Sequence, residues 1–488
     1  MDERDEREAA VIAAVPTGAW IGGREVDVDR TFPVHDPATG EVLTEVADAG
    51  PAEGDRALAV AADTQAAWAA TPPRERGEVL RRAFELLGER LDDLALLMTL
   101  EMGKPLAESR AEISYAAEFL RWFSEEAVRI DGGYLRNPAG PGRLVVLRQP
   151  VGPCLLITPW NFPMAMGTRK LGPALAAGCT AIVKPAALTP LSMLALARVL
   201  ADAGLPDGVL SVVPTSDAAA LTEPLFADDR LRKLSFTGST EVGRVLLRQA
   251  ADQILKVSLE LGGNAPLIVF DDADLDVAVE QTLVAKMRNI GEACTAANRI
   301  LVHADVADPF TKALADRMSG LTIGRRTDPD VQVGPLIEEK ARSKVADLVA
   351  DAVGKGGEVV AGGRSIGGPG WFYEPTVLGG IPADAELNRV EIFGPVAAIR
   401  TFTSEAEALA LANDTEYGLT GYLFTRDLAR ALRVAEAMEV GMVGLNQGLV
   451  SNPAGSFGGI KQSGIGREGG FTGIDEYLER KLLFVAEP

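Results

Sequence analysis

Cys294 is a candidate nucleophile because small residues surround it in the segment Asn289-Ile-Gly-Glu-Ala-Cys-Thr-Ala-Ala-Asn-Arg299. A helix is predicted before this segment and a strand after it, so we expect a loop that leaves the sulfur accessible. A thiolate can attack a carbonyl carbon when a base or a local dipole lowers its pKa. A free cysteine is more often buried and inert, and the segment alone leaves both interpretations open. Cys154 and Cys179 lie in or beside predicted buried strands, which favours the inert interpretation for both.

A glutamate and an asparagine are candidates to assist such a thiol. Glu260 stands between two leucines at a predicted strand end, in Leu259-Glu-Leu-Gly-Gly-Asn264. Burial there would raise its pKa and suit it to general base catalysis, although an exposed turn glutamate is the alternative. Asn161, in Pro159-Trp-Asn-Phe-Pro163, can offer its amide N–H to a developing oxyanion, or it can simply form a turn.

Two segments could hold a phosphate, and one glycine motif is rejected. Phe236-Thr-Gly-Ser-Thr-Glu-Val-Gly243 lies between a predicted strand and a predicted helix, whose free N–H groups can bind a pyrophosphate. Lys184 follows a predicted parallel strand at the end where such sheets bind ligands, but it could also be a solvated surface lysine. The GxGxxG stretch Gly464-Ile-Gly-Arg-Glu-Gly469 has no preceding strand and no βαβ unit around it, so we reject it as a nucleotide motif.

Composition excludes several classes of function. With 48 basic and 69 acidic residues the net charge is −21, which repels nucleic acid and anionic membranes. With two histidines and three cysteines, the chain has few ligands for a metal site and few candidate histidines for a Ser-His-Asp hydrolase. The odd, small cysteine number favours a reducing compartment, and the acidic start Met1–Glu8 lacks the features of a signal peptide. We therefore expect a cytoplasmic protein with a frayed N-terminal tail.

The chain length of 488 residues predicts two or three domains. Residues 51–70, 74–97 and 105–128 have helical periodicity. From about residue 150, short apolar strands alternate with helices, which predicts parallel sheets built from βαβ units. The stretch 441–470 is expected to form loops, and the final strand 481–485 has no partner in its own series, so it could pair with another subunit.

Together these segments resemble the aldehyde dehydrogenase superfamily over nearly the whole chain, from about residue 20 to 485. The resemblance implies an α/β fold, with a Rossmann-like cofactor domain, an α/β catalytic domain and a small β oligomerisation arm. The motifs that carry it are Pro159–Pro163, Lys184–Ala186, Phe236–Gly243, Leu259–Asn264, the Cys294 loop, Glu391–Pro395 and Phe457–Gly464. The implied boundaries are 1–130 with 150–259 for the cofactor domain, 260–440 for the catalytic domain, 131–149 with 468–488 for the arm, and 441–467 for loops that return toward the active site.

The resemblance also implies a role for individual residues. Cys294 would form a thiohemiacetal and then a thioester, Glu260 would act as general base, and Asn161 would form an oxyanion hole with the backbone N–H of Cys294. Glu391 would hold the nicotinamide ribose and Phe393 would pack near the nicotinamide. The implied cofactor-binding residues are Thr158, Pro159, Trp160, Asn161, Lys184, Pro185, Ala186, Ala187, Gly238, Ser239, Gly243, Leu261, Glu391 and Phe393.

Within the superfamily, the sequence is most similar to succinate-semialdehyde dehydrogenases. These enzymes hold the far carboxylate of the substrate with two arginines and a serine, and the matching residues are Arg169, Arg288 and Ser451. Two guanidinium groups can pair with a carboxylate, although either arginine alone could be a surface charge. Glutarate semialdehyde, one methylene longer, is an alternative substrate, because one methylene is worth only about 1–3 kcal/mol in such a pocket.

Cofactor choice depends on Ala187, where relatives that prefer NAD often have a glutamate that would repel a 2′-phosphate. Ala187 permits NADP, which we favour, while NAD stays possible. Ala296 replaces a second cysteine with which some succinate-semialdehyde dehydrogenases form a disulfide, so no such local redox switch is expected. A CoA-acylating dehydrogenase and a catalytically silent structural protein are the rival interpretations, and Glu260 argues against the first. The arm and the last strand predict a homodimer or homotetramer.

Overall fold

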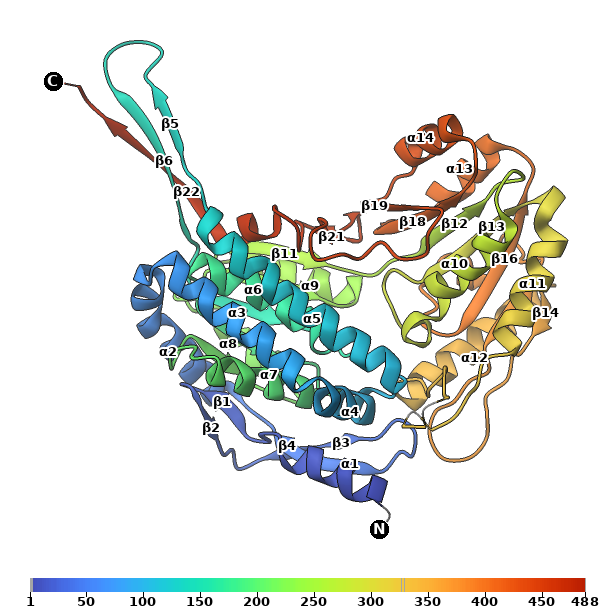
Figure 1. Ribbon diagram of the computed structural model, residues 1–488, viewed down its shortest axis with the longest axis horizontal. Coiled ribbons are helices and arrows are strands. Elements are labelled where there is room, and N and C mark those ends of the chain that lie inside the picture. The colour runs from blue at the N-terminus through green and yellow to red at the C-terminus, as the bar shows by residue number, and fades with distance from the viewer. Residues whose placement is uncertain (1–2, 326, 329, 488) are drawn as a thin grey trace.

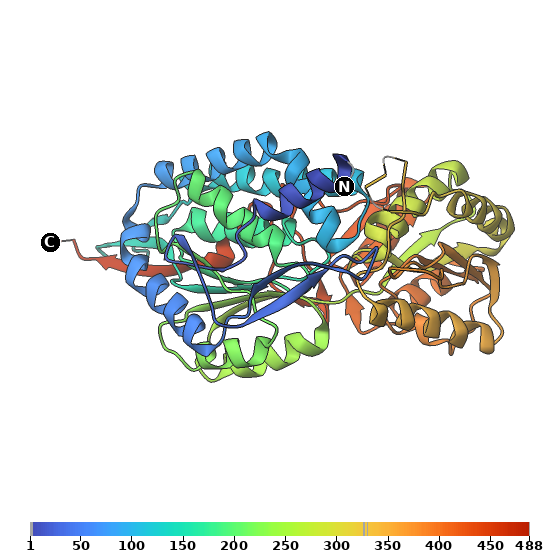
Figure 2. The same cartoon turned by 90° about the horizontal axis from the view of Figure 1, so that it is seen from below.

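The computed structural model describes residues 3–325, 327–328 and 330–487. Two α/β halves lie side by side, one formed mainly by the N-terminal part of the chain and one by residues from about 265 to 450 (Figures 1 and 2). A narrow three-stranded arm projects from the first half (Figure 1). Among the described residues, no helix is both long enough and apolar enough to cross a membrane.

The first half is built on an eight-stranded sheet in the order β2-β1-β9-β8-β7-β10-β11-β21. Its five central strands, β9 to β11 in that order, run parallel and are buried on both faces along most of their length, as parallel sheets require. The strands are β1 (Ala19–Ile21), β2 (Arg24–Val26), β7 (Cys154–Ile157), β8 (Ala181–Lys184), β9 (Leu210–Val212), β10 (Lys233–Thr237), β11 (Lys256–Glu260) and β21 (Gly464–Ile465).

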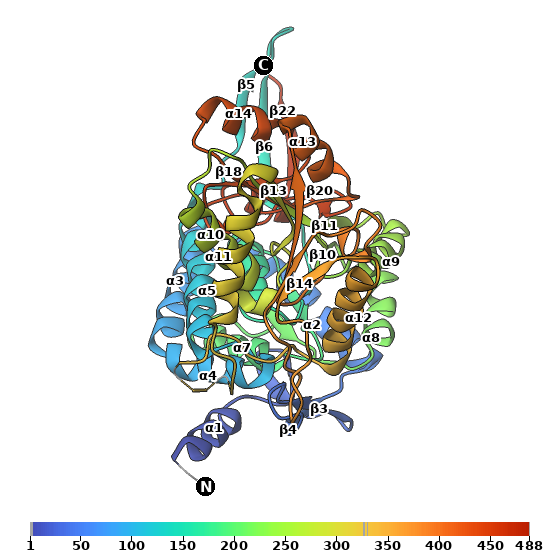
Figure 3. The same cartoon turned by 90° about the vertical axis from the view of Figure 1, so that its right-hand side faces the viewer.

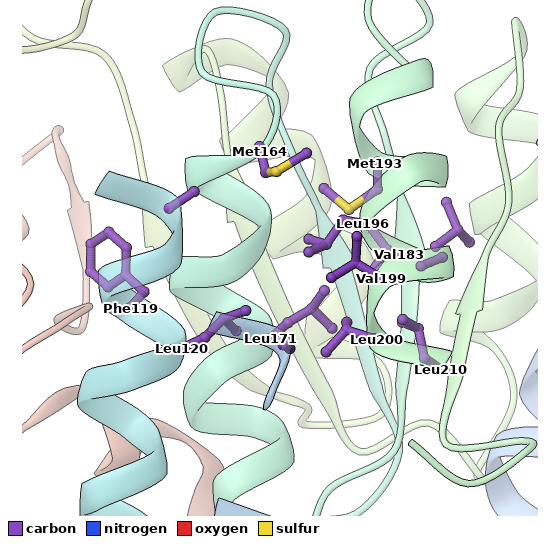
Figure 4. Packing of buried hydrophobic residues seen from close by; sticks show 14 of the residues in the cluster. Phe119, Leu120, Met164, Leu171, Val183, Met193, Leu196, Val199, Leu200 and Leu210 are labelled. Carbon is purple, nitrogen blue, oxygen red and sulfur yellow. The ribbon is translucent and has the colours of Figure 1, made fainter. Parts of the chain in front are cut away.

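Helices cover both faces of this sheet. One layer packs through a large apolar core, in which Phe119, Leu171 and Leu200 come from three neighbouring helices and meet Val183 of the sheet (Figure 4). This layer contains α3 (Pro73–Glu89), α4 (Leu91–Met102), α5 (Leu106–Glu126), α6 (Ala165–Ala177) and α7 (Leu191–Asp202). The opposite layer contains α2 (Pro51–Ala70), α8 (Ala218–Phe226) and α9 (Thr240–Ala251), which share a second core.

The second half has a seven-stranded sheet in the order β14-β15-β16-β13-β12-β18-β19, parallel except at β14. Separate apolar cores lie on its two faces, one under α10, α11 and α12 and the other under α13 and α14. The strands are β12 (Ala265–Val269), β13 (Ala297–His303), β14 (Glu358–Ala361), β15 (Thr376–Gly379), β16 (Val396–Phe402), β18 (Thr420–Phe424) and β19 (Met442–Leu445). The helices are α10 (Leu275–Met287), α11 (Ala307–Ser319), α12 (Glu339–Gly354), α13 (Glu405–Asn413) and α14 (Leu428–Ala437).

The arm consists of β5 (Gly133–Arg136), β6 (Arg143–Pro150) and β22 (Leu478–Val485), all antiparallel. The last strand was expected to have no partner in its own series and to be free to pair with another subunit; within this chain β22 pairs with β6 along its whole length, from Leu478 with Pro150 to Val485 with Arg143. Its remaining edge is open, because β22 is the outer strand of this sheet. Two smaller antiparallel pairs join β3 (Thr31–His35) to β4 (Val42–Ala47) and β17 (Tyr417–Gly418) to β20 (Ile460–Lys461).

Some local expectations were wrong. Residues 3–13 form helix α1 (Glu3–Ala13) and not a frayed tail, because Val11 is 92% covered in the apolar core. Helix α1 lies at the opposite end of the molecule from the arm (Figure 3). The predicted helix 74–97 is two helices, with Arg90 ending α3 and preceding α4. The stretch 441–470 contains three short strands, β19, β20 and β21.

Candidate active site

A cavity of about 410 Å³ is lined by residues from both halves. The chain reaches it at the carboxyl ends of parallel strands: the loop after β7 carries Asn161, the turn after β10 carries Ser239, and β11 ends at Glu260. Ligands of open α/β sheets bind at this end of the strands. The second half contributes Cys294, from the loop before β13.

Cys294 follows a backbone that is held in an uncommon conformation. Asn289 and Ile290 both have positive φ, 55° and 61°, in the 3₁₀ turn η2 (Arg288–Gly291). Such a conformation costs about 1–3 kcal/mol per non-glycine residue and is least favourable for a β-branched one. The Cys294 thiol is half-buried at the cavity wall, whereas Cys154 and Cys179 are fully buried in the core of the first half.

Burial raises the pKa of the Cys294 thiol well above its usual value, and the neighbouring Glu260 raises it further. The thiol is therefore neutral in the resting site and needs a base to become a nucleophile. Glu260 is buried, and neither of its carboxyl oxygens has a hydrogen-bond partner among the described residues. Burial and the Glu468 carboxylate raise the pKa of Glu260 to about 8. A carboxyl group in this state is mostly protonated at neutral pH and becomes a base as the pH rises toward 8.

Behind Glu260 lies a buried charged cluster that sequence reasoning missed. Lys170 donates to Glu468 at 2.5 Å and to Ser235 at 3.0 Å, and Arg169 lies 3.7 Å from the second Glu468 oxygen. Glu468 belongs to the rejected glycine motif, where β21 pairs with β11 and no strand-to-helix phosphate turn forms. No local pattern singles out Glu468, because its partners are almost three hundred residues away in the chain.

Asn161 lies between β7 and α6, and its side-chain amide donates to the main-chain oxygen of Glu292 at 2.9 Å. An amide nitrogen has two hydrogens, so one remains for an acceptor in the cavity that Asn161 lines. The bond also ties the Asn161 loop to the Cys294 loop, because Glu292 is two residues before the thiol.

The three predicted carboxylate-binding residues lie together at the cavity wall. Arg169 donates to the Tyr115 hydroxyl at 2.8 Å and to Ser451 at 3.4 Å, and the Tyr115 and Ser451 hydroxyls are hydrogen-bonded to each other. The Arg288 guanidinium carbon lies 4.8 Å from the centre of the Phe162 ring and 5.8 Å from that of Tyr115. Two nitrogen atoms of Arg169, Nε and Nη1, have no hydrogen-bond partner among the described residues. The two arginines and the Ser451 hydroxyl can therefore bind an anion in this cavity.

Tyr115 is the second functional candidate that sequence reasoning missed. It lies in the middle of α5, where an aromatic residue with helical spacing looks like any core residue. Its hydroxyl nevertheless reaches Arg169 and Ser451, and its ring edge packs against Phe119 at 4.9 Å between centroids.

Eight of the predicted cofactor residues line the same cavity as Cys294: Pro159, Trp160, Asn161, Gly238, Ser239, Leu261, Glu391 and Phe393. Trp160 and Phe393 pack edge to face, with ring centroids 5.4 Å apart. Burial raises the pKa of the Glu391 carboxyl to about 7, and one of its oxygens accepts a bond from the Gly263 N–H. Gly243 packs against Leu261, since a Cβ at residue 243 would lie 2.5 Å from a Leu261 methyl carbon.

The other predicted cofactor residues lie near this cavity without lining it: Thr158, Lys184, Pro185, Ala186 and Gly243. Lys184 ends β8, its carbonyl accepts from Thr158 N–H, and burial lowers the pKa of its ammonium to about 8. Ala187 lines a neighbouring cavity of about 620 Å³, which shares Ile337, Glu338 and Lys340 with the first. Helix α9, with Ser239 as its N-cap, adds N–H donors, so the residues present fit a dinucleotide with a pyrophosphate. Among the described residues, no cluster of acidic, histidine and cysteine side chains could hold a metal ion.

Comparisons with known proteins agree with this geometry. A sequence model of the aldehyde dehydrogenase family matches residues 24–483. A succinate-semialdehyde dehydrogenase of Paenarthrobacter nicotinovorans is 56% identical, covering 92% of this chain and 99% of its own. A glutarate-semialdehyde dehydrogenase of Pseudomonas aeruginosa is 52% identical and covers 96% of both chains. A succinate-semialdehyde dehydrogenase [NADP(+)] of Escherichia coli is 50% identical and covers 97% of both. The crystal structure of a succinate-semialdehyde dehydrogenase from Burkholderia pseudomallei superposes with a TM-score of 0.96 at 50% identity, over 97% of this chain and 99% of that one.

Proposed function

The chain belongs to the aldehyde dehydrogenase family, and we propose that within this family it oxidises succinate semialdehyde to succinate. It is an NAD(P)-dependent aldehyde dehydrogenase, so the family, the fold class and the enzyme class predicted from the sequence are confirmed. One observation carries the substrate proposal: Arg169, Arg288 and Ser451 line the same cavity as Cys294. An aldehyde held at the thiol can thus place a distal carboxylate between two guanidinium groups.

In this proposal Cys294 attacks the aldehyde carbon, and Glu260 accepts the thiol proton. The resulting oxyanion is stabilised by the free N–H of the Asn161 amide and the backbone N–H of Cys294. The bound nicotinamide cofactor supplies the hydride acceptor. After Glu260 has released the thiol proton to solvent, it takes a proton from the water that attacks the thioester. It then returns this proton to the departing sulfur, which releases the carboxylic acid and restores the thiol.

Glutarate semialdehyde is the second candidate substrate, favoured by the 52% identity to the Pseudomonas enzyme. The matched experiment measures kcat/KM for succinate semialdehyde, glutarate semialdehyde and butanal. Butanal has the same carbon chain as succinate semialdehyde but no carboxylate. The proposal expects succinate semialdehyde to be preferred over butanal by about 100-fold or more, since hydrogen bonds to a charged group contribute about 1.5–3 kcal/mol each. Equal values for the two compounds would refute it.

Arg288→Met tests the carboxylate site more cleanly than a change at Arg169, because Arg169 also lies beside Glu468 and influences Glu260. The expected result is a loss of about 10- to 100-fold in kcat/KM for succinate semialdehyde, with the value for butanal unchanged. A loss of the same size for both substrates would contradict the role of Arg288 as a carboxylate ligand.

For the cofactor, we propose a preference for NADP over NAD. Ala187 puts no negative charge where a 2′-phosphate would lie, and Lys184 ends the adjacent strand. A relative that is 50% identical carries NADP(+) in its name. Ala187→Glu is expected to lower kcat/KM for NADP by about tenfold or more, since each 1.4 kcal/mol of repulsion is a factor of ten, and to leave the value for NAD unchanged or higher.

Three free cysteines support a location in a reducing compartment, the cytoplasm.

We also propose that the chain forms a homodimer or homotetramer through the arm. The arm is a single sheet whose outer strand β22 is exposed along almost its whole length, with Leu482 62% and Phe484 55% accessible. Apolar surface on an open edge strand favours association with another chain.

A further inference from the structure

The two groups that would stabilise the oxyanion come from opposite halves of the molecule. Asn161 follows β7 of the first sheet, whereas the backbone N–H of Cys294 precedes β13 of the second. An oxyanion hole works only when the separation of its two donors is held constant to within about 0.5 Å. The structure must therefore hold these two loops against each other.

Asn289 joins the two loops through its side chain. Its amide nitrogen donates to the main-chain oxygen of Asn161 at 3.1 Å and to that of Glu292 at 2.9 Å, so both of its hydrogens are used. The Glu292 oxygen also accepts from the Asn161 side chain. The backbone N–H of Asn289 donates to the Glu108 carboxylate at 2.6 Å, which helps to keep residue 289 in its left-handed conformation.

Lys104 holds the same carbonyl from the other side. Its ammonium is 1% exposed, donates to the Asn161 oxygen at 2.8 Å and forms an ion pair with Glu112. The ammonium nitrogen also lies 4.3 Å from the centre of the Phe162 ring, with which it makes a cation–π contact. The other oxygen of Glu112 accepts from the N–H groups of residues 164 and 165, at 3.0 and 3.1 Å, where α6 begins.

We propose that Lys104 and Asn289 are positioning residues for the oxyanion hole, acting through the main-chain oxygen of Asn161. The inference rests on the proposed oxyanion role of Asn161. Lys104 fixes the position of the Asn161 peptide relative to α5, and Asn289 fixes the distance of that peptide from the Cys294 loop. Neither side chain lines the cavity itself.

Asn289→Gly is the sharpest test, because glycine adopts the φ of 55° at residue 289 without strain and only the two amide bonds are lost. The rate of the first-turnover burst of NADPH is expected to fall by about 10- to 100-fold. This decrease is no larger than the one expected when an oxyanion donor is removed altogether. KM for the aldehyde stays within about threefold, since the carboxylate ligands are intact. Alkylation of Cys294 by iodoacetamide stays within about twofold, because that displacement forms no oxyanion. An equal loss in burst and alkylation would overturn the inference.

The chain offers a matched control in Asn446, which also has a left-handed φ, 52°, and whose amide donates to a carbonyl, that of Thr425, at 3.0 Å. Asn446→Gly is expected to leave the burst rate within about twofold of the unchanged protein. The double change Lys104→Met with Glu112→Gln removes the buried ion pair without leaving one charge unpaired, and a slower burst with unchanged alkylation is expected there too.

A double-mutant cycle separates the inference from the function on which it rests. If Asn161→Ala leaves the burst rate unchanged, the oxyanion role of Asn161 is wrong. If Asn161→Ala slows the burst but Asn289→Gly does not, only the positioning role is wrong. When both slow it, Asn289→Gly on the Asn161→Ala background should add less than about threefold, because residues that act through one group are not additive. A full second loss would overturn the inference.

Discussion

At the scale of single residues, the site pairs a thiol with a carboxyl group that is buried beside it. Burial raises the pKa of both Cys294 and Glu260, and it brings the pKa of Glu260 to about 8. Water-exposed carboxyl groups titrate near 4.3, so a surface glutamate would be a much weaker base at neutral pH. The burial of Glu260 is thus part of the catalytic chemistry.

The raised pKa of Glu260 predicts the pH dependence of turnover. Only the carboxylate form can accept a proton, so kcat should rise as the pH passes upward through about 8 and level off above it. Glu260→Gln should lower kcat by about 10²- to 10⁴-fold and abolish this rise. Because Glu260 also accepts the thiol proton in the proposed mechanism, stopped-flow measurements should show a slower first turnover of NADPH in this variant as well. A wild-type profile that is flat between pH 6 and 9 would be incompatible with this role.

Tyr115 provides a second prediction, about substrate charge. Its hydroxyl bonds to Arg169 and Ser451, so it both orients two anion ligands and can itself donate to a carboxylate. Tyr115→Phe keeps the ring and its packing on Phe119 while removing the hydroxyl. We expect kcat/KM for succinate semialdehyde to fall by about tenfold, corresponding to about 1.4 kcal/mol, and that for butanal to stay within twofold. A parallel loss for both aldehydes would indicate a merely structural tyrosine.

The sequence could predict the residues whose chemistry shows in their own neighbourhood. Cys294, Glu260 and Asn161 each stand beside glycine, proline or small residues at the end of a predicted element, and the structure places all three at one cavity. Tyr115, Glu468 and Lys104 could not be found in this way. Their partners at the site lie dozens to hundreds of residues away, although Lys104 also pairs with the nearby Glu112, and only the packing of α5, β21 and the loop after α4 brings them to the site.

At the scale of elements, helix α9 links local capping to cofactor binding. Ser239 is its N-cap and accepts from the Val242 N–H at 3.4 Å, while the same residue lines the cavity. Ser239→Ala should cost about 1 kcal/mol of stability through loss of the cap. Ser239→Asp keeps a capping oxygen but places a negative charge where the pyrophosphate would bind. The aspartate variant should therefore unfold at the temperature of the unchanged protein yet show a KM for NADP raised by about tenfold or more.

The assignment of the pyrophosphate site to the start of α9 requires Ser239→Asp to raise the KM for NADP more than Ser239→Ala does. An equal KM in the two variants would contradict it. If Ser239→Asp leaves the KM for NADP unchanged, the pyrophosphate does not bind at the start of α9. Thermal unfolding measured alongside the kinetics keeps the two effects of the residue apart.

Helices and strands were predictable where full burial determines the pattern of apolar residues in the sequence. They were not predictable where their residues are only partly buried. The central parallel strands β7, β8 and β10 are fully buried and have apolar residues at their centres or on alternate positions, and each was expected within one or two residues of its observed bounds. The edge strands β14 and β19 have four residues each and are largely exposed or only partly buried, so no alternating pattern was visible in them. Helix α1 was missed because its charged start resembles a tail, although Val11 docks against the core of the first half.

At the scale of the whole molecule, the cavity depends on the contact between the two halves. Each sheet is covered on both faces by helices, but Ala293 and Ala296, on either side of Cys294, are buried in the apolar core of the first half. The bonds among Asn161, Asn289 and Glu292 add polar contacts at the same place. The anion-binding arginines also come one from each half, Arg169 from α6 and Arg288 from the turn after α10. Substrate binding and catalysis therefore both require the same relative placement of the halves.

The arm makes a prediction about assembly. Leu482 and Phe484 on β22 are 62% and 55% exposed, on a thin sheet with no layer packed over it among the described residues. A three-stranded sheet of this kind gains stability when its apolar side chains are covered. The pair of changes Leu482→Glu and Phe484→Glu should therefore shift the sedimentation coefficient to that of the 51.5 kDa chain alone. Ile254→Glu, on a turn where the side chain is 90% exposed, is the matched control and should leave the oligomer intact. If the double variant sediments like the unchanged protein, the arm does not hold the assembly together.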